Sequence, residues 1–346
     1  MVDTCLWRQK TMAIVSRSDS AIRVGIIRCD THAHWYAPLI EKPDPQRYRK
    51  AHRGCHYYFY EPSAPHRPRF PAVRGMRIAK VFDEEDRTRA EGLSEAYCGR
   101  PKVCHTLDEV SDGVDLVYIA DCNGEGEDHL RLARPGLVKG VPHFIDKPFA
   151  YRLKDARRMI AIAEEHGTAV MCASLLRYVP HLARFRTSLA NIAPVHSLFI
   201  PNYGPSLACL FHCLSIAQHL LGEGCKSVES MGTEYCDLLR LRYRRSHALV
   251  FGARGTEPKR PAAAAQYGHS GYCVSAYGAG GDVHTPRIDD YLYPHAGVRI
   301  VKMARQLALT KKPPIPYETM LEPVKMIEAA RLAHNTGRRV DLEDVR

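Results

Sequence analysis

Val141-Pro-His-Phe-Ile-Asp-Lys-Pro-Phe-Ala150 is the stretch on which the interpretation of this chain depends. Its apolar run ends in an acid, a lysine and a proline, a pattern typical of a buried parallel strand with charge at its carboxyl edge, where open α/β sheets bind ligands. The proline restricts Lys147 to an extended trans geometry or a tight cis turn, so the direction in which the backbone presents its ammonium is fixed. Burial is expected to lower the pKa of Lys147 and let it exchange a proton with a substrate hydroxyl. A strand-end Asp146/Lys147 pair that only caps a helix is the alternative.

Alternating strand and helix patterns surround this stretch on both sides. Short apolar runs that indicate buried strands occupy residues 21–27, 76–82, 114–120 and 170–174. Helical patterns separate them at residues 87–97, 129–137 and 153–166. This alternation predicts a doubly wound parallel sheet of the Rossmann type.

The pattern changes beyond residue 175, where a second kind of sheet is expected. Leucines alternate with arginines along residues 237–245, which predicts a half-exposed antiparallel strand, and residues 246–252 form its hairpin partner. Helices at residues 293–310 and 318–335 close the chain, with Gly337 as a stop signal. We therefore predict an α/β protein in which an N-terminal Rossmann domain precedes an α+β domain with an open, mostly antiparallel sheet.

The expected domain organisation follows from these patterns. Residues 1–20 are polar and aperiodic, which predicts a loose extension, and residues 21–150 form the dinucleotide-binding domain. Residues 151–346 form a substrate and oligomerisation domain, with residues 151–175 and the C-terminal helix bridging the two. Residues 38–71 contain seven prolines and several aromatics. They are predicted to be an irregular insertion that packs over the active-site cleft or docks on the protein's own surface.

The turn after the first strand is the candidate phosphate site. Dinucleotide folds carry G-x-G-x-x-G here, because backbone amides must approach a pyrophosphate without side chains in the way. In this chain the glycine places hold Arg28, Asp30 and Ala33. Thr31 and Arg28 could still contact phosphate, whereas Asp30 would repel it unless it caps the following helix.

An acid at the end of the second strand points to the choice of cofactor. Asp83 stands where dinucleotide folds place the acceptor for the adenosine ribose, and it would repel the 2′-phosphate of NADP. NAD is therefore the predicted cofactor. Arg87 and Arg89 leave NADP possible.

The loop after residues 114–120 supplies further polar side chains at the same sheet edge. Asp121, Asn123 and His129 could hold a ribose or a nicotinamide amide, or could belong to a solvated acidic loop. The candidate cofactor-binding residues are Arg28, Asp30, Thr31, His32, Asp83, Asp121, Asn123, His129, Asp146 and Lys147.

Composition limits the classes of function. The net charge is +11, but the basic residues are scattered and accompany no nucleic-acid-binding motif, so no nucleic-acid partner is expected. No apolar run of about 18 residues and no signal-peptide core is present, so no membrane partner is expected. The 12 cysteines are dispersed without a CxxC pair, which indicates reduced thiols and a cytoplasmic location. His32 and His34 match no zinc spacing, and no metal is expected.

Four motifs in order resemble one enzyme family. They are Asp146-Lys147-Pro148, Arg177-Tyr-Val-Pro180, the stretch 211–222 around His212, and the tail from Pro313-Pro-Ile-Pro-Tyr317 to Gly337-Arg-Arg-Val340. With them the chain resembles the Gfo/Idh/MocA family, named after glucose-fructose oxidoreductase, inositol dehydrogenase and rhizopine catabolism. The resemblance covers Ile22 to the end apart from the insertion.

The resemblance implies an NAD(P)-dependent oxidoreductase acting on a hydroxyl of a sugar-like or cyclic polyol substrate. Lys147 would bind the reacting oxygen, His212 would be the acid/base, and Arg177 would join them in binding substrate. The family also implies a homo-oligomer formed through the sheet of the C-terminal domain.

Two departures from the family pattern keep other functions open. The cofactor turn lacks its glycines, and Ala208 stands where the family has an acid four residues before its histidine. The alternatives are an NAD-dependent glycoside-cleaving enzyme that oxidises its substrate transiently before elimination, and a nucleotide-binding member without turnover.

Overall fold

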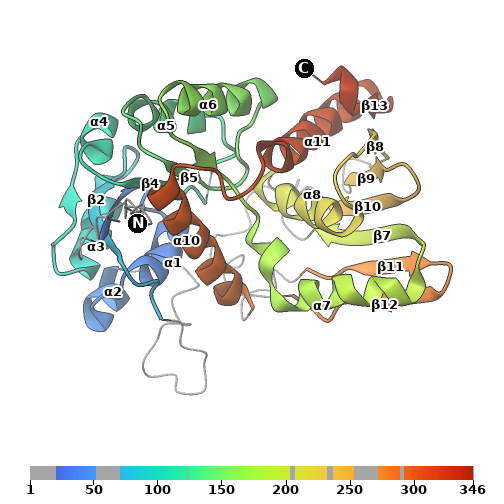
Figure 1. The fold of residues 1–346 in the computed structure, drawn as a ribbon, viewed down its shortest axis with the longest axis horizontal. Coiled ribbons are helices and arrows are strands. Elements are labelled where there is room, and N and C mark those ends of the chain that lie inside the picture. Colours follow the sequence, from blue (N-terminus) through green and yellow to red (C-terminus); the bar gives the residue numbers. More distant parts are fainter. Residues whose placement is uncertain are drawn as a thin grey trace, which may run out of the picture.

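The computed structural model describes residues 21–51, 71–122, 124–202, 207–231, 237–252, 272–288 and 292–345. These residues form two lobes, each built on its own sheet (Figure 1). The first sheet has six parallel strands and the second has seven strands that are mostly antiparallel. The predicted fold class is confirmed.

The first lobe is a Rossmann-type layer structure. Its strands lie in the order β3-β2-β1-β4-β5-β6, so the order reverses between β1 and β4. They are β1 (Ile22–Ile27), β2 (Met76–Phe82), β3 (Lys102–Val103), β4 (Leu116–Ile119), β5 (His143–Ile145) and β6 (Val170–Met171). Every residue of β4 and β5 is buried, because helices cover both faces of the sheet. In open α/β sheets, ligands bind at the carboxyl edge beside such a reversal of the strand order.

The helices of this lobe follow its strands in the expected alternation. They are α1 (Thr31–Ile40), α2 (Pro45–Ala51), α3 (Arg87–Ala96), α4 (Leu107–Ser111), α5 (His129–Val138) and α6 (Leu153–Glu165). Pro38 lies inside α1, and α2 follows after a short turn, so residues 38–51 are not the irregular loop that the prolines predict. The rest of the predicted insertion, like residues 1–20, lies outside the described residues.

The second lobe is built on a sheet with the order β12-β11-β7-β10-β9-β8-β13. Only the β7–β10 pair is parallel among the described pairings. Its strands are β7 (Val195–Asn202), β8 (Ser227–Ser230), β9 (Asp237–Arg242), β10 (His247–Gly252), β11 (Ser275–Gly278), β12 (Gly281–His284) and β13 (Val340–Asp341). Leu239 and Leu241 are buried while Arg242 is exposed, which is the alternation expected of a sheet with one solvated face.

Helices cover one face of the second sheet and join the lobes. They are η2 (Leu175–Tyr178), α7 (Pro180–Ser188), η3 (Leu189–Ile192), α8 (Leu207–Leu221), α10 (Tyr293–Thr310), α11 (Tyr317–Thr336) and η4 (Leu342–Asp344). Helix α11 is tied to the start of α6, since Leu153 N donates to Glu328 Oε2 over 2.8 Å and Arg331 lies over the ring of Tyr151, two residues earlier. None of the described helices is both long and apolar enough to cross a bilayer.

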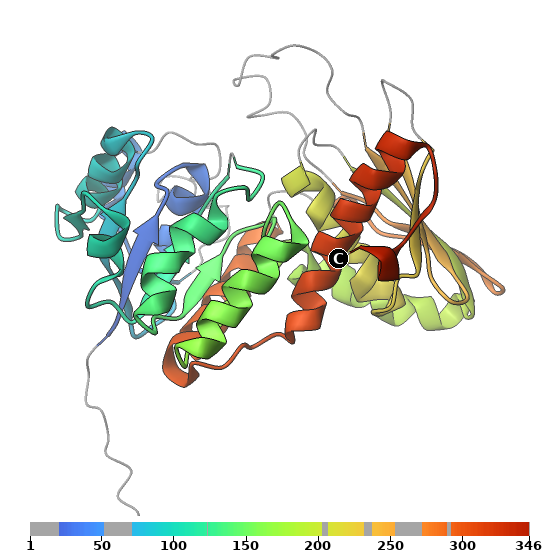
Figure 2. The same cartoon turned by 90° about the horizontal axis from the view of Figure 1, so that it is seen from above.

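Helix α10 returns to the first lobe, although it comes late in the chain (Figure 2). It packs against α1 and β5. The close approach needs Gly297, because a Cβ built there would lie 2.5 Å from the Trp35 ring and 2.7 Å from Leu39. The helix itself was predicted correctly, but its place beside α1 could not be seen in its periodicity.

Candidate functional site

The site lies where the turn after β1 meets the loops after β4 and β5. Asp30 caps α1: its carboxylate accepts from His32 N over 2.9 Å and from Cys122 N over 2.6 Å, which also fastens the β4 loop. Burial raises the pKa of Asp30. Because this carboxylate occupies the amide of His32, that amide is not available to a phosphate. Of the two roles considered for Asp30, the structure shows the cap.

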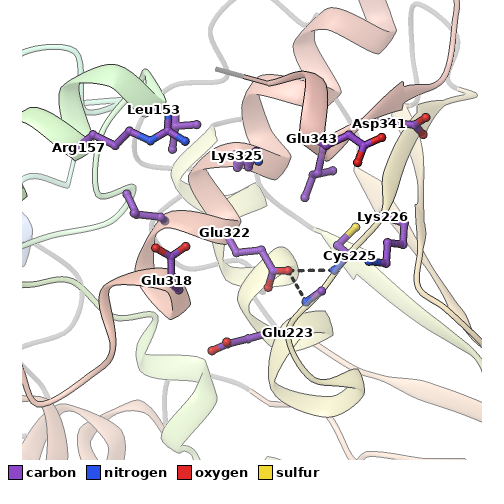
Figure 3. Close-up of a pocket in the computed structure, with 13 residues that line it drawn as sticks. Leu153, Arg157, Glu223, Cys225, Lys226, Glu318, Glu322, Lys325, Asp341 and Glu343 are labelled. Carbon is purple, nitrogen blue, oxygen red and sulfur yellow. Dashed lines mark hydrogen bonds between the residues drawn. The ribbon is translucent and has the colours of Figure 1, made fainter.

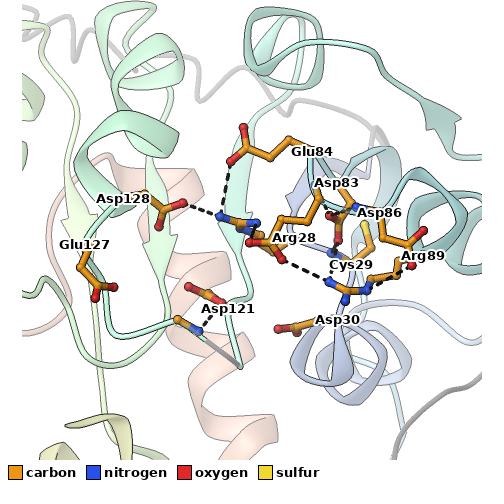
Figure 4. A network of polar contacts seen from close by, with 12 residues as sticks. Arg28, Cys29, Asp30, Asp83, Glu84, Asp86, Arg89, Asp121, Glu127 and Asp128 are labelled. Atoms are coloured by element: carbon orange, nitrogen blue, oxygen red, sulfur yellow. Dashed lines mark hydrogen bonds and ion pairs between the residues drawn. The ribbon is translucent and has the colours of Figure 1, made fainter. Parts of the chain in front are cut away.

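Arg28 adopts a left-handed backbone conformation, with φ of 65°, at the end of β1. Its guanidinium pairs with three acids: Glu85 at 2.5 Å, Glu84 at 3.4 Å, and Asp128 in a close ion pair. Figure 4 shows Arg28 between Glu84 and Asp128. Only 8% of the side chain is exposed. Its Nε has no hydrogen-bond partner in the described chain. Arg28 thus joins the β1 turn to the loops after β2 and β4 and keeps one donor to spare.

Asp83 lies at the end of β2, as expected, but its carboxylate is turned into the protein. It accepts hydrogen bonds from Cys29 N at 2.8 Å, Glu85 N at 3.0 Å and Asp86 N at 3.1 Å. The side chain is fully buried. Asp83 therefore holds the two neighbouring turns together.

Lys147 occupies the carboxyl edge of β5, and its bond to Pro148 is cis. The residue is 6% exposed, and its Nζ makes no hydrogen bond or ion pair with any residue that the structure describes. Burial favours the neutral amine, but Asp146, the thiols of Cys122 and Cys209, and Asp30 outweigh it and raise the pKa of Lys147. The expectation of a lowered pKa was wrong, because burial was weighed without the acids that accompany it.

His212 lies on α8 and faces the same region. Its Nδ1 is 2.7 Å from Ser174 Oγ, and its ring packs edge-on against Tyr272. Burial, then the positive charges of Lys147 and His32, hold the pKa of His212 well below its usual range. His212 is therefore neutral near pH 7 and has a ring nitrogen, Nε2, that Ser174 does not occupy.

His32 is the third basic group beside Lys147. Its Nδ1 makes a close contact with Asp146 Oδ2, while Asp146 Oδ1 accepts from Lys147 N over 2.8 Å. Burial lowers the pKa of His32, but Cys122 and Asp146 outweigh it and raise this pKa well above the ordinary value. The two histidines near Lys147 thus hold opposite protonation states near neutral pH.

Comparisons with known proteins bear on the family and on the fold. A family model described as "Oxidoreductase family, NAD-binding Rossmann fold" (GFO_IDH_MocA) matches residues 59–174, which include Asp83 and Lys147. Residues 59–174 are thus similar to the family that the four motifs also resemble. No curated protein matches the chain.

Solved structures share the fold at low sequence identity. GenD2 from gentamicin A biosynthesis, in complex with NAD, has a TM-score of 0.71 and 15% identity, over 94% of this chain and 97% of that chain. The myo-inositol dehydrogenase from Lactobacillus casei, in complex with NAD(H) and myo-inositol, has a TM-score of 0.69 and 14% identity, over 93% and 96%. An oxidoreductase from Agrobacterium radiobacter, in complex with NAD+, L-tartaric acid and magnesium, has a TM-score of 0.67 and 14% identity, over 93% and 99%.

Some residues of this site would suit NAD, the cofactor named in the description of the matched family model. The buried Nε of Arg28 lacks a hydrogen-bond acceptor, and guanidinium donors suit phosphate oxygens. Arg28 and Thr31 would hold the phosphates. Asp83 is fully buried and already accepts three backbone hydrogen bonds, so its carboxylate is not open to a ribose hydroxyl.

The predicted residues of the β4 loop support one another. Asp121 accepts from Gly124 N over 2.9 Å and lies 3.3 Å from His129 Nε2, which lowers the pKa of Asp121 to about 2 despite burial. The other ring nitrogen of His129 is 3.2 Å from Phe149 O. Ligand atoms of Asp121, Asp128 and His129 lie within 4.8 Å of one another, but Arg28 already pairs with Asp128. These contacts order the loop; Asn123 lies outside the described residues.

Arg177 lies on η2, and its side chain is held by residues of the second lobe. Its Nη1 makes a close hydrogen bond to Gln218 Oε1, and Gln218 in turn donates to Glu322 Oε2 over 2.7 Å. Sequence reasoning did not find Ser174, Cys122 or Cys209 as members of the site. Only the position of Ser174 at the end of a predicted strand offered a signal.

A separate hollow of about 540 Å³ lies between α6, α11 and the edge of the second sheet (Figure 3). Arg157, Lys325, Glu318 and Glu322 line it. Glu322 accepts from Gly224 N over 2.6 Å and from Cys225 N over 2.9 Å. Neither Lys147 nor His212 borders this hollow.

Proposed function

We propose that this protein is an NAD-dependent oxidoreductase that transfers hydride between the nicotinamide and a hydroxyl-bearing carbon of a sugar-like or cyclic polyol substrate. One observation carries the proposal. Lys147 places a buried ammonium, without a partner among the described residues, beside the neutral His212. A buried cation is costly unless something pairs with it, so the missing partner is best supplied by the oxygen of a substrate.

Residues of the chain would divide the work of this reaction. The bound NAD supplies or accepts the hydride. The Lys147 ammonium binds the reacting oxygen and stabilises the negative charge that develops on it. Ser174 fixes the orientation of His212 through Nδ1, so that Nε2 is free to exchange a proton with the hydroxyl.

The test is formation of NADH by the purified chain with a panel of polyols, including myo-inositol, and with simple sugars. Turnover with NAD that exceeds turnover with NADP is the expected result, because Asp83, Glu84 and Glu85 gather negative charge at the end of β2. No NADH from any polyol or sugar, in a protein that binds NAD, would contradict the proposal.

Two other functions make different predictions. A glycoside-cleaving enzyme returns the hydride to its substrate, so it releases a sugar product without net NADH. A member without turnover is motivated by Arg28, Asp30 and Ala208, and it would bind NAD without either product. Assays of NADH and of glycoside cleavage on the same sample separate the three.

We also propose a homo-oligomer formed through the outer face of the second sheet, in a cytoplasmic protein. Phe199, Phe251 and Tyr277 are 36%, 39% and 46% exposed on neighbouring strands, and the rings of Phe199 and Phe251 lie 6.4 Å apart. Covering this apolar patch favours a second copy of the chain. Light scattering should give more than one subunit, and Phe199→Glu should produce monomers.

In the proposed oxidoreductase, residues 21–150 would form the domain that holds the cofactor, and residues 151–346 would form the domain that covers the substrate.

A further inference from the structure

Reduction of a carbonyl takes up a proton as well as a hydride, and the proton needs a donor. Lys147 is a poor one, because the surrounding acids keep its ammonium charged. His212 is neutral near pH 7, because burial and the charges of Lys147 and His32 hold its pKa low. Ala208, one helical turn before His212, has no titratable group. A group that is protonated near pH 7 would complete the site, and this inference rests on the proposed oxidoreductase function.

The contact between His32 and Asp146 has the geometry of such a group. Nδ1 of His32 makes a close contact with Oδ2 of Asp146, and Oδ1 of Asp146 accepts a hydrogen bond from Lys147 N. Asp146 is 2% exposed, whereas the His32 side chain is 20% exposed. Nε2 of His32 has no hydrogen-bond partner among the residues described. The acid thus lies behind the ring, and Nε2 is the nitrogen left for a ligand.

The charges around His32 come from four parts of the fold. Asp146 and Lys147 face it from the end of β5, Cys122 from the loop after β4, and His212 from α8. Asp30 precedes it at the start of α1 and also interacts with it. The paired acid is nearest, so the imidazolium is stabilised although two cationic or basic groups oppose it.

We propose that the His32–Asp146 pair is a second proton-transfer group of this site, with His32 as a catalytic residue and Asp146 as its positioning residue. In the direction of reduction, hydride adds to the carbonyl carbon, the carbonyl oxygen takes the proton from His32 Nε2, and the ring is left neutral with Nδ1–H bonded to Asp146. Oxidation of the hydroxyl is the reverse: the O–H and C–H bonds break, and Nε2 takes the proton. His212 would share the proton transfer with this pair.

The pairing can be tested without any turnover. Histidine-labelled protein is titrated by NMR, and the His32 signal is identified by its loss in His32→Gln. We expect His32 to titrate above the ordinary histidine range, and Asp146→Asn to move its pKa down while Asp146→Glu preserves it. A pKa of His32 in the ordinary histidine range that Asp146→Asn does not change would overturn the proposal. If the Asp146→Asn variant fails to fold, the Asp146→Glu variant still tests it.

Kinetics then test the role of the pair. His32→Gln should lower kcat about 100-fold with little change in KM, while His196→Gln, at an exposed position on β7, should match the wild type. Reduction by the wild type should fall as the pH rises through the pKa of His32, and oxidation should rise over the same range. Asp146→Asn should move the pH dependence of reduction and that of oxidation to lower pH.

The outcomes separate this inference from the proposed function. If His32→Gln works within about twofold of the wild type while Lys147→Ala is inactive, the inference is wrong and the oxidoreductase stands. If the wild type forms no NADH at all, the proposed function fails, and the NMR titration still decides whether Asp146 controls the proton on His32.

Discussion

The β2 end and the β5 end of the carboxyl edge of the first sheet differ in how their charges are paired. At the β2 end, Arg28 is shared among Glu84, Glu85 and Asp128, and Asp83 is filled with backbone donors. At the β5 end, Lys147 has no described partner and two histidines stand nearby. The first end is satisfied by the protein itself, so a ligand must compete there. The second end is incomplete until a ligand arrives.

This difference suggests a division between affinity and chemistry. Competing contacts at the β2 end reduce the binding energy that an anionic cofactor can gain there. At the β5 end, the buried Lys147 ammonium has no ion-pair partner among the described residues. Because water screens it poorly, it would interact strongly with the oxygen of a bound substrate. Substitutions at the β5 end should therefore act on turnover, and those at the β2 end on cofactor affinity.

The largest effect is expected for Lys147→Ala. Removal of the ammonium should lower kcat about 100- to 1,000-fold, as loss of one preorganised donor at a developing oxyanion does, with NAD affinity nearly unchanged. Steady-state rates and NAD titration measure the two quantities. Lys302→Ala, at an exposed position on α10, is the matched control. Equal loss of NAD binding and of turnover would remove the distinction between the two ends.

A smaller effect is expected for Arg28→Ala. Loss of the guanidinium leaves three acids facing the phosphates of NAD, so the Kd for NAD should rise about tenfold or more, the scale of a charge-assisted hydrogen bond. Calorimetry measures the change. The control is Arg23→Ala, because Arg23 lies on the same strand and pairs with Asp115 at the opposite edge of the sheet. An unchanged Kd would show that Arg28 does not contact the cofactor.

The smallest effect is expected for Glu85→Gln, which weakens the competition for Arg28. Glu85 is 56% exposed, so its ion pair contributes about 1 kcal/mol or less. The Kd for NAD should fall about twofold to fivefold, with a weaker dependence on salt. Glu91→Gln, on the exposed side of α3, should leave the Kd unchanged. Weaker NAD binding in the Glu85 variant would mean that Glu85 orients Arg28 rather than competes for it.

Local pattern was enough to predict the fold, because strand and helix periodicities do not depend on distant residues. The carboxyl ends of β1, β2, β4 and β5 were predicted from those periods, and with them the neighbourhood of Lys147. The return of α10 to α1 could not be predicted, since the complementarity of Gly297 and Trp35 exists only once both helices are placed.

The site was less predictable because its chemistry comes from pairs that are far apart in the sequence. Arg28 meets Asp128 across 100 residues, and His32 meets Asp146 across 114. Residue type alone gave His32 and Asp146 as separate cofactor contacts. The direction of the Lys147 pKa was mispredicted for the same reason, as it depends on acids and thiols that only the fold brings near.

The late return of α10 has a consequence for how the chain is made. Strand β1 leaves the ribosome long before residues 293–310, so the surface of α1 around Trp35 must wait uncovered while most of the polypeptide is still being translated. A chain interrupted ahead of Tyr293 would keep that apolar surface bare and should depend on chaperones or aggregate, even though every strand of its first sheet had already been synthesised.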